Sequence, residues 1–215
     1  MSRKADPPFI RGKTFDGTAT PSSSAPYDGA FIIGREFDFE DYDFAVTNQV
    51  KPVRSNRQVT VRVVRNACTI NSGGEITTGY LQPKRVVTYT AGSYNTTVDG
   101  YGCTTAQGPA VLVDEFLPSA GVQPNDLFYV VVRGPAMALL TPGQAVNISY
   151  NDNLVALTAA TSGATTAGRV AGAVYTNLTS SQLADPLRNS IGRALTAATS
   201  GNTAGNILVD VTELN

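Results

Sequence analysis

The sequence contains no histidine and no tryptophan among its 215 residues. Histidine is the side chain that most often transfers protons and binds metal ions at neutral pH, so histidine-based catalytic triads are excluded. The sequence also lacks a phosphate-binding loop, a dinucleotide-binding fingerprint and a Gly-x-Ser-x-Gly nucleophile motif. Asp114-Glu115 and the acidic stretch 36–43 could supply a carboxylate pair for glycoside hydrolysis, but neighbouring acids on a strand normally point to opposite faces. We therefore expect a protein that is not an enzyme and has no cofactor or metal ion.

Charged residues are scarce, at 15% of the chain, whereas a typical domain has about a quarter. The 16 basic and 17 acidic residues give a net charge of −1, which offers no electrostatic attraction to nucleic acid or to an anionic membrane. No apolar run approaches the roughly 18 residues of a membrane span, and no apolar signal sequence is present. We expect neither nucleic acid nor a membrane as a partner.

Cysteine is also rare, with only Cys68 and Cys103, which lie 35 residues apart without a Cys-x-x-Cys motif. This spacing argues against a zinc site. Two alternatives stay open: a pair of buried thiols, or a disulfide if the two Cα atoms lie within about 7 Å.

Short strand patterns and turns dominate what is present. We expect one strand over residues 59–70, where apolar and polar residues alternate at first, and another over 127–132, where a continuous apolar run is typical of a strand buried on both faces. Gly134-Pro135 predicts a turn after this run. These patterns predict an all-β fold, a small β-barrel or sandwich with an extended, irregular N-terminal arm and little helix.

Other segments carry weaker patterns. Residues 96–108, rich in Gly, Thr and Tyr, predict a long loop. Residues 179–189 are the one fair candidate for a short helix, although Pro186 interrupts it. Strand is expected again over 191–198 and 207–211.

Three zones are expected along the chain: an extended arm over residues 1–29, a β-rich region with long loops over 30–115, and a compact, low-charge β-barrel or sandwich domain over 116–215. The last zone has four basic and five acidic residues, and no lysine follows Lys84. It also holds an octamer, Ala-Leu-Thr-Ala-Ala-Thr-Ser-Gly, twice, at 156–163 and 194–201. The repeat suggests a small β unit used twice, or one sheet edge built from two similar hairpins.

Aromatic and apolar residues are spaced along the N-terminal part and are the candidate contacts to a partner. The arm is broken by prolines and loosened by glycines and serines, yet a purely flexible tail rarely carries such anchors. In the stretch 36–44 aromatic residues interleave with acids, and Glu40-Asp41 breaks the alternation as a β-bulge would. The stretch fits a solvated strand, a docking strip for a basic partner surface, or an oxygen-ligand cation site. The proposed interface residues are Phe9, Ile10, Phe15, Tyr27, Phe37, Phe39, Tyr42 and Phe44.

The C-terminal part resembles the small β-barrel region of the decoration (cement) proteins on the heads of tailed bacteriophages. The matching segments are Val-Val-Val-Arg-Gly-Pro-Ala at 130–136, Thr-Pro-Gly-Gln-Ala-Val at 141–146, Asn-Asp-Asn-Leu-Val at 151–155, Ile-Gly-Arg-Ala-Leu-Thr-Ala-Ala-Thr at 191–199 and Ile-Leu-Val-Asp-Val at 207–211. Asn151-Asp152 stands where Gly-Asp is common in that family.

The resemblance implies a virion protein that is made in the host cytoplasm and binds the outer face of the assembled capsid. Its expected partners are the major capsid protein and two further copies of itself in a homotrimer, which multiplies weak contacts into avidity. Two other classes stay open: another virion part, such as a tail, fibre or head-closure protein, and a secreted β adhesin or carbohydrate-binding module.

Overall fold

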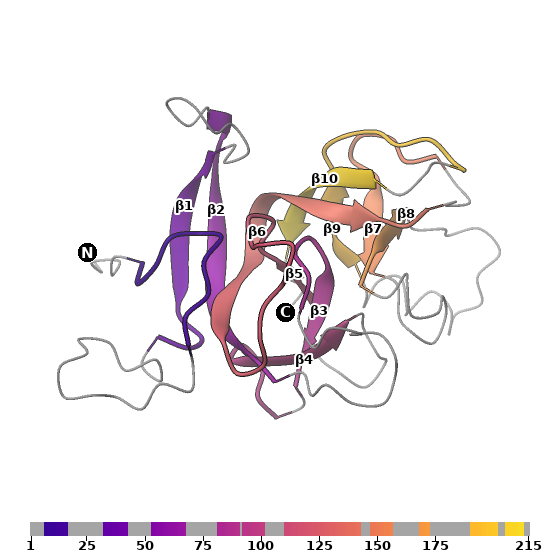
Figure 1. Cartoon of the computed structure of the whole chain (residues 1–215). Coiled ribbons are helices and arrows are strands. Elements are labelled where there is room, and N and C mark those ends of the chain that lie inside the picture. The colour runs from indigo at the N-terminus through magenta and orange to yellow at the C-terminus, as the bar shows by residue number, and fades with distance from the viewer. Residues whose placement is uncertain are drawn as a thin grey trace, which may run out of the picture.

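A computed structural model of the chain (Figure 1) describes ten stretches of residues. They are residues 7–16, 32–42, 53–67, 81–90, 92–101, 110–142, 147–156, 168–172, 190–201 and 205–212. The expected helix at 179–189 and both cysteines lie outside these residues. No helix of the described part is long and apolar enough to cross a membrane.

The described residues form β-strands and no helix, which confirms the all-β prediction. The strands are β1 (Glu36–Tyr42), β2 (Val53–Asn66), β3 (Val86–Tyr89), β4 (Thr97–Tyr101), β5 (Ala110–Val113), β6 (Leu127–Leu140), β7 (Asn153–Ala156), β8 (Val170–Gly172), β9 (Ser190–Ala194) and β10 (Gly205–Thr212).

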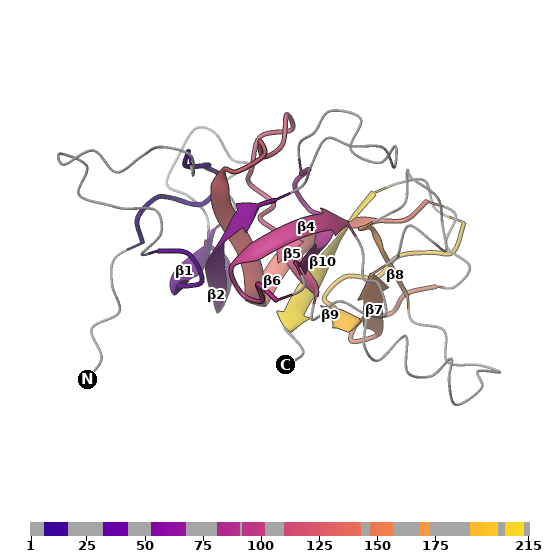
Figure 2. The same cartoon turned by 90° about the horizontal axis from the view of Figure 1, so that it is seen from below.

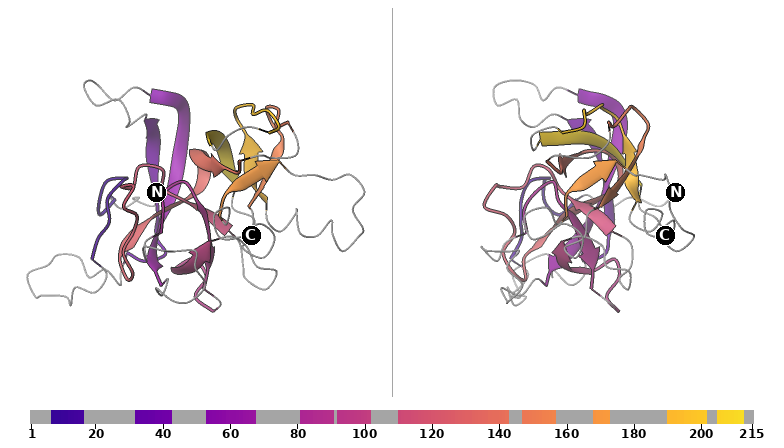
Figure 3. Two further views of the ribbon diagram at one scale, coloured as in Figure 1. Left: turned by 45° about the vertical axis from the view of Figure 1, so that its right-hand side comes forward. Right: turned by 90° about the vertical axis from the view of Figure 1, so that its right-hand side faces the viewer.

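The strand pairings close two circuits that share the long strand β6. The order β1-β2-β4-β3-β5-β6-β10-β9-β7-β8 carries two additional pairings, β2 with β6 and β6 with β8. β2, β4, β3, β5 and β6 therefore form a first circuit, and β6, β10, β9, β7 and β8 form a second. Figures 2 and 3 show β1 and β2 at one side of the molecule and β7, β8 and β9 at the other. Closed pairing of this kind fits the expected sandwich-like or barrel-like architecture.

Alternation along the strands separates two hydrophobic cores. In β6, Phe128, Val130 and Val132 pack into a first core. The residues that alternate with them, Leu127, Tyr129 and Val131, pack into a second core. All six are buried, so the prediction of a strand buried on both faces is confirmed. The first core takes side chains from β2, β3, β4 and β5 and fills the first circuit, while the second core continues under β1 and into the second circuit.

The predicted turn at Gly134-Pro135 is wrong, because β6 runs through both residues without a break. The register slips between Thr60 and Val61 of β2, which face Arg133 and Val131 of β6, so β6 carries one extra residue there. Gly134 has φ +96, and a Cβ atom on it would lie 2.4 Å from the carbonyl oxygen of Gln58. The glycine therefore allows a bend at which β6 passes from β2 to β10, rather than a turn.

The expected loop at 96–108 contains a strand, β4. This strand pairs with β2 in parallel and with β3 antiparallel, so its hydrogen bonds come from distant strands rather than from a local pattern. The expected irregularity at Glu40-Asp41 is present, as a register shift between Glu40 and Tyr42 in the β1–β2 pair.

The repeated octamer starts at equivalent places in two neighbouring strands. Ala156 is the last residue of β7, and Ala194 is the last residue of β9. Because β7 and β9 pair antiparallel, the two copies leave opposite ends of this pair. The strand expected over 191–198 ends earlier than predicted, because β9 ends at Ala194. The rest of the first copy, residues 157–163, lies outside the described residues.

Candidate functional site

Residues 7–16, called the arm below, lie against the start of β6. Phe15 and Leu127 exchange two main-chain hydrogen bonds, with N–O distances of 2.9 and 2.7 Å. The Tyr129 hydroxyl donates a hydrogen bond of 2.9 Å to the carbonyl oxygen of Phe9. Burial raises the pKa of Tyr129, which keeps this hydroxyl protonated and able to donate. The arm is therefore bound through its main chain at both ends.

An ion pair without solvent exposure fixes the middle of the arm. The Nη2 and Nε atoms of Arg11 lie 2.7 and 3.2 Å from Oδ1 of Asp114, and both side chains are fully buried. The other Asp114 oxygen accepts a hydrogen bond of 3.0 Å from the main-chain nitrogen of Gly12. The Arg11 guanidinium also stacks over the Phe116 ring at 4.6 Å. One carboxylate thus holds both a side chain and the main chain of the arm.

Gly12 is a required residue of this arrangement. Its φ is +82, and a Cβ atom would lie 2.7 Å from the carbonyl oxygen of Phe116. An L side chain rarely adopts this backbone conformation, and none would fit against Phe116. The sequence Arg11-Gly12 therefore combines the charge and the close approach that the contact with residues 114–116 needs.

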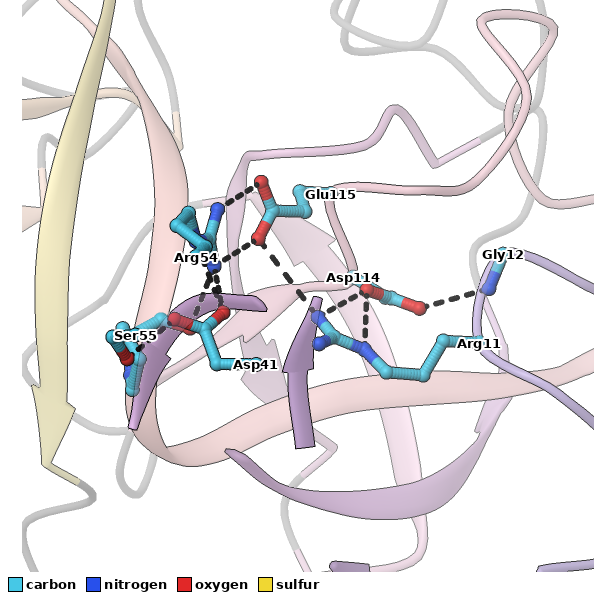
Figure 4. A network of polar contacts seen from close by, with 8 residues as sticks. Arg11, Gly12, Asp41, Arg54, Ser55, Asp114 and Glu115 are labelled. Carbon is cyan, nitrogen blue, oxygen red and sulfur yellow. Dashed lines mark hydrogen bonds and ion pairs between the residues drawn. The ribbon is translucent and has the colours of Figure 1, made fainter. Parts of the chain in front are cut away.

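The polar network extends from the arm to β1 and β2 (Figure 4). Arg54 of β2 donates hydrogen bonds of 2.9 and 3.0 Å to Glu115, and its Nε lies 2.9 Å from Asp41 of β1. Burial opposes the charge on Arg54, but the bonds to Glu115 and Asp41 outweigh it and raise the pKa of the guanidinium. Glu115 also lies 3.9 Å from Arg11. Three carboxylates and two guanidinium groups thus join the arm to three distant segments of the fold.

This arrangement suits anchoring rather than proton transfer. Asp114, Glu115 and Asp41 each face an arginine at ion-pair distance, and Ser55 donates a further hydrogen bond of 2.7 Å to Asp41. Carboxylates that face arginines at this distance form charge-assisted hydrogen bonds, which fix orientation. Within the described ranges, no group of three or more acids or cysteines could hold a metal ion.

Three of the proposed interface residues meet around Tyr129. The Tyr129 ring lies 4.3 Å from Phe9, 6.2 Å from Phe37 and 5.6 Å from Phe39, measured between centroids. Phe37 is only 5% exposed, so it offers almost no area to a partner. Phe9 and Phe39 are half-buried against the same core. These aromatic residues bind the arm and β1 to β6.

The other proposed residues divide into exposed and undescribed ones. Ile10 is 60% exposed and Phe15 is 37% exposed. Ile10 directly precedes the buried Arg11, and the Phe15 ring stacks on Phe9 at 6.5 Å between centroids. Tyr42 is half-buried, and its hydroxyl donates a hydrogen bond to Glu40. Tyr27 and Phe44 lie outside the described residues. The exposed apolar pair on the arm is thus the part of the proposed set that is available for contact.

No protein-family model matches the chain, and no characterised protein sequence or solved structure does so either.

Proposed function

We propose that the chain is a non-enzymatic virion structural protein that binds the outer surface of the assembled phage capsid and stabilises it as a homotrimer. Its partners are the major capsid protein and further copies of itself. The protein is made in the host cytoplasm and resides on the outer capsid surface of the virion. The resemblance of residues 128–215 to head-decoration proteins supports this function, and the low charge of those residues suits a protein that works through apolar and main-chain contacts.

The observation that carries the proposal is the exposed apolar pair Ile10 and Phe15 on an anchored arm. Such side chains normally gain by burial, at roughly 25 cal/mol for each Å² of apolar surface. Arg11, between them, is fully buried on Asp114, so the pair is presented in a fixed position. A partner then does not have to order the arm on binding, which removes a main cost of association. Three copies in one trimer multiply the contact.

Replacing Ile10 or Phe15 by aspartate is expected to weaken capsid binding by about tenfold or more, because the anchor residues at the centre of an interface contribute about 2 kcal/mol or more and 1.4 kcal/mol equals one factor of ten. The measurement is co-sedimentation of each variant with capsids of the same phage over a concentration series. Ile10 is 60% exposed, so the melting temperature of Ile10→Asp should stay close to that of the parent chain. The Phe15 ring stacks on Phe9 at 6.5 Å between centroids, so Phe15→Asp should also lower the melting temperature, and its binding is compared at a temperature where it is folded.

Tyr150→Asp is the matched control, because Tyr150 is 70% exposed but precedes β7 in the second circuit, far from the arm in sequence. It should bind as the parent does. Equal capsid occupancy for all three variants would remove the arm from the binding surface. Attachment of the parent chain to tails rather than heads would assign it to another part of the virion.

A further inference from the structure

We infer that Asp114, Phe116, Leu127 and Tyr129, called the arm clamp below, form a peptide-binding site that takes the arm of a second copy of this chain in the oligomer. The arm then ties neighbouring protomers together rather than only its own. This inference rests on the homotrimer of the proposed function, but it does not require that the trimer binds a capsid.

The arm clamp has the properties of a specific site for a short peptide that turns at an Arg-Gly pair. It recognises an arginine through a buried carboxylate at 2.7 Å, the following glycine through its main-chain nitrogen at 3.0 Å, and a phenylalanine through ring stacking at 4.3 Å. It adds an isolated β-bridge with two main-chain hydrogen bonds at Phe15. A single β-bridge thus supplements charge and aromatic recognition, and main-chain pairing of this kind is one element of peptide binding at sheet edges.

The clamp is positioned without help from the arm. Asp114 directly follows β5 and donates its main-chain nitrogen to the Tyr129 carbonyl oxygen at 3.2 Å. Leu127 and Tyr129 belong to β6, which pairs with β2 and β5. The site therefore belongs to the first circuit, and it can receive the same peptide from another chain.

The chain between the arm and the fold is long enough for exchange. Fifteen residues, 17–31, separate Asp16 from Ile32. Sixteen Cα steps can span about 50 Å when extended, at roughly 3.3 Å each. A compact chain of 215 residues has a radius of gyration of about 17 Å, so the arm can reach the clamp of an adjacent copy. Exchange of an identical element between protomers builds an interface from contacts that already exist within one chain.

Disulfide trapping tests the inference in the full-length chain. Phe15→Cys and Leu127→Cys, combined with Cys68→Ser and Cys103→Ser, place one thiol on the arm and one at its bridge partner. After mild oxidation, exchange gives covalent multiples of the 22.5 kDa chain on a non-reducing gel, up to about 68 kDa for three chains (three times 22.5 kDa). Adding Arg11→Ala should abolish these multiples, because the arm is then no longer held on Asp114.

A purely internal disulfide, with every chain migrating singly, overturns the inference. Should Leu127→Cys prevent folding, a photo-reactive benzoylphenylalanine in place of Phe15 keeps the aromatic character and reports the same neighbour. Cross-links only within single chains would then contradict exchange. Capsid binding is therefore read on the parent chain, which keeps Phe15. Internal trapping together with capsid binding by the parent chain leaves the proposed function standing, whereas covalent multiples together with a parent chain that ignores capsids remove the function and keep the exchange.

Discussion

Asp114→Ala is expected to lower the free energy of unfolding by about 3–5 kcal/mol, because it removes the carboxylate at 2.7 Å from the buried Arg11 guanidinium and leaves only Glu115 at 3.9 Å. It also removes the acceptor for the Gly12 main-chain nitrogen. For a chain of this size, such a loss corresponds to a melting temperature lower by about 6–20 °C. Urea unfolding measures the loss, and limited proteolysis should show faster cleavage within the arm.

The exposed ion pair between Arg57 and Asp210 provides the control. Its Nη2–Oδ2 distance is 2.7 Å, the same as in the buried pair, but the side chains are 49% and 29% exposed. Arg57→Ala should therefore cost at most about 1 kcal/mol. The double variant Arg11→Ala with Asp114→Ala should be less destabilised than the sum of the two single variants, because the unpaired charge disappears. Equal losses for Asp114→Ala and Arg57→Ala would show that the buried pair does not anchor the arm.

Gly192→Ala is expected to cost at least about 3 kcal/mol, because this position of β9 is accessible only to glycine. Its φ is +143, and a Cβ atom would lie 2.0 Å from the carbonyl oxygen of Asp210 in β10. The obstacle is backbone, so no side-chain rotation relieves it. We expect the β9–β10 pairing to open and the second circuit to lose stability, which a urea titration followed by circular dichroism would detect.

Gly100→Ala is the matched control for this prediction. Gly100 also lies within a strand, β4, but an added Cβ atom meets nothing within 4 Å and no positive φ is involved. Its effect on the free energy of unfolding should stay within about 1 kcal/mol. If Gly192→Ala unfolds at the same urea concentration as Gly100→Ala, the close approach of β9 to β10 is absent from the folded protein.

The strands were predictable where their hydrogen bonds and burial follow from a local pattern. Residues 127–132 are apolar throughout, and they are buried on both faces in β6. The turn predicted at Gly134-Pro135 was wrong because the same residue types that form turns also form bends in long strands. Whether the chain reverses there depends on β10, which begins some seventy residues later and pairs with the second half of β6.

The candidate site was predictable only in part. The aromatic residues spaced along the arm indicated anchors, and the alternation at Phe37 and Phe39 indicated a strand with one aromatic face. The sequence does not say that Phe9, Phe37 and Phe39 pack around Tyr129 of the same chain. Arg11 and Asp114 are 103 residues apart, and no spacing rule connects two isolated charges over that distance. The local signals were an arginine before a glycine in an apolar arm and an acidic pair directly after an apolar strand, and they indicate a close contact only once the fold has brought them together.

The mass of the purified chain in solution, measured by light scattering with and without capsids of the same phage, tests the proposed function most directly. We predict a trimer of about 68 kDa (three times 22.5 kDa) that leaves the free fraction when capsids are added. A monomer that stays free in the presence of capsids would contradict it.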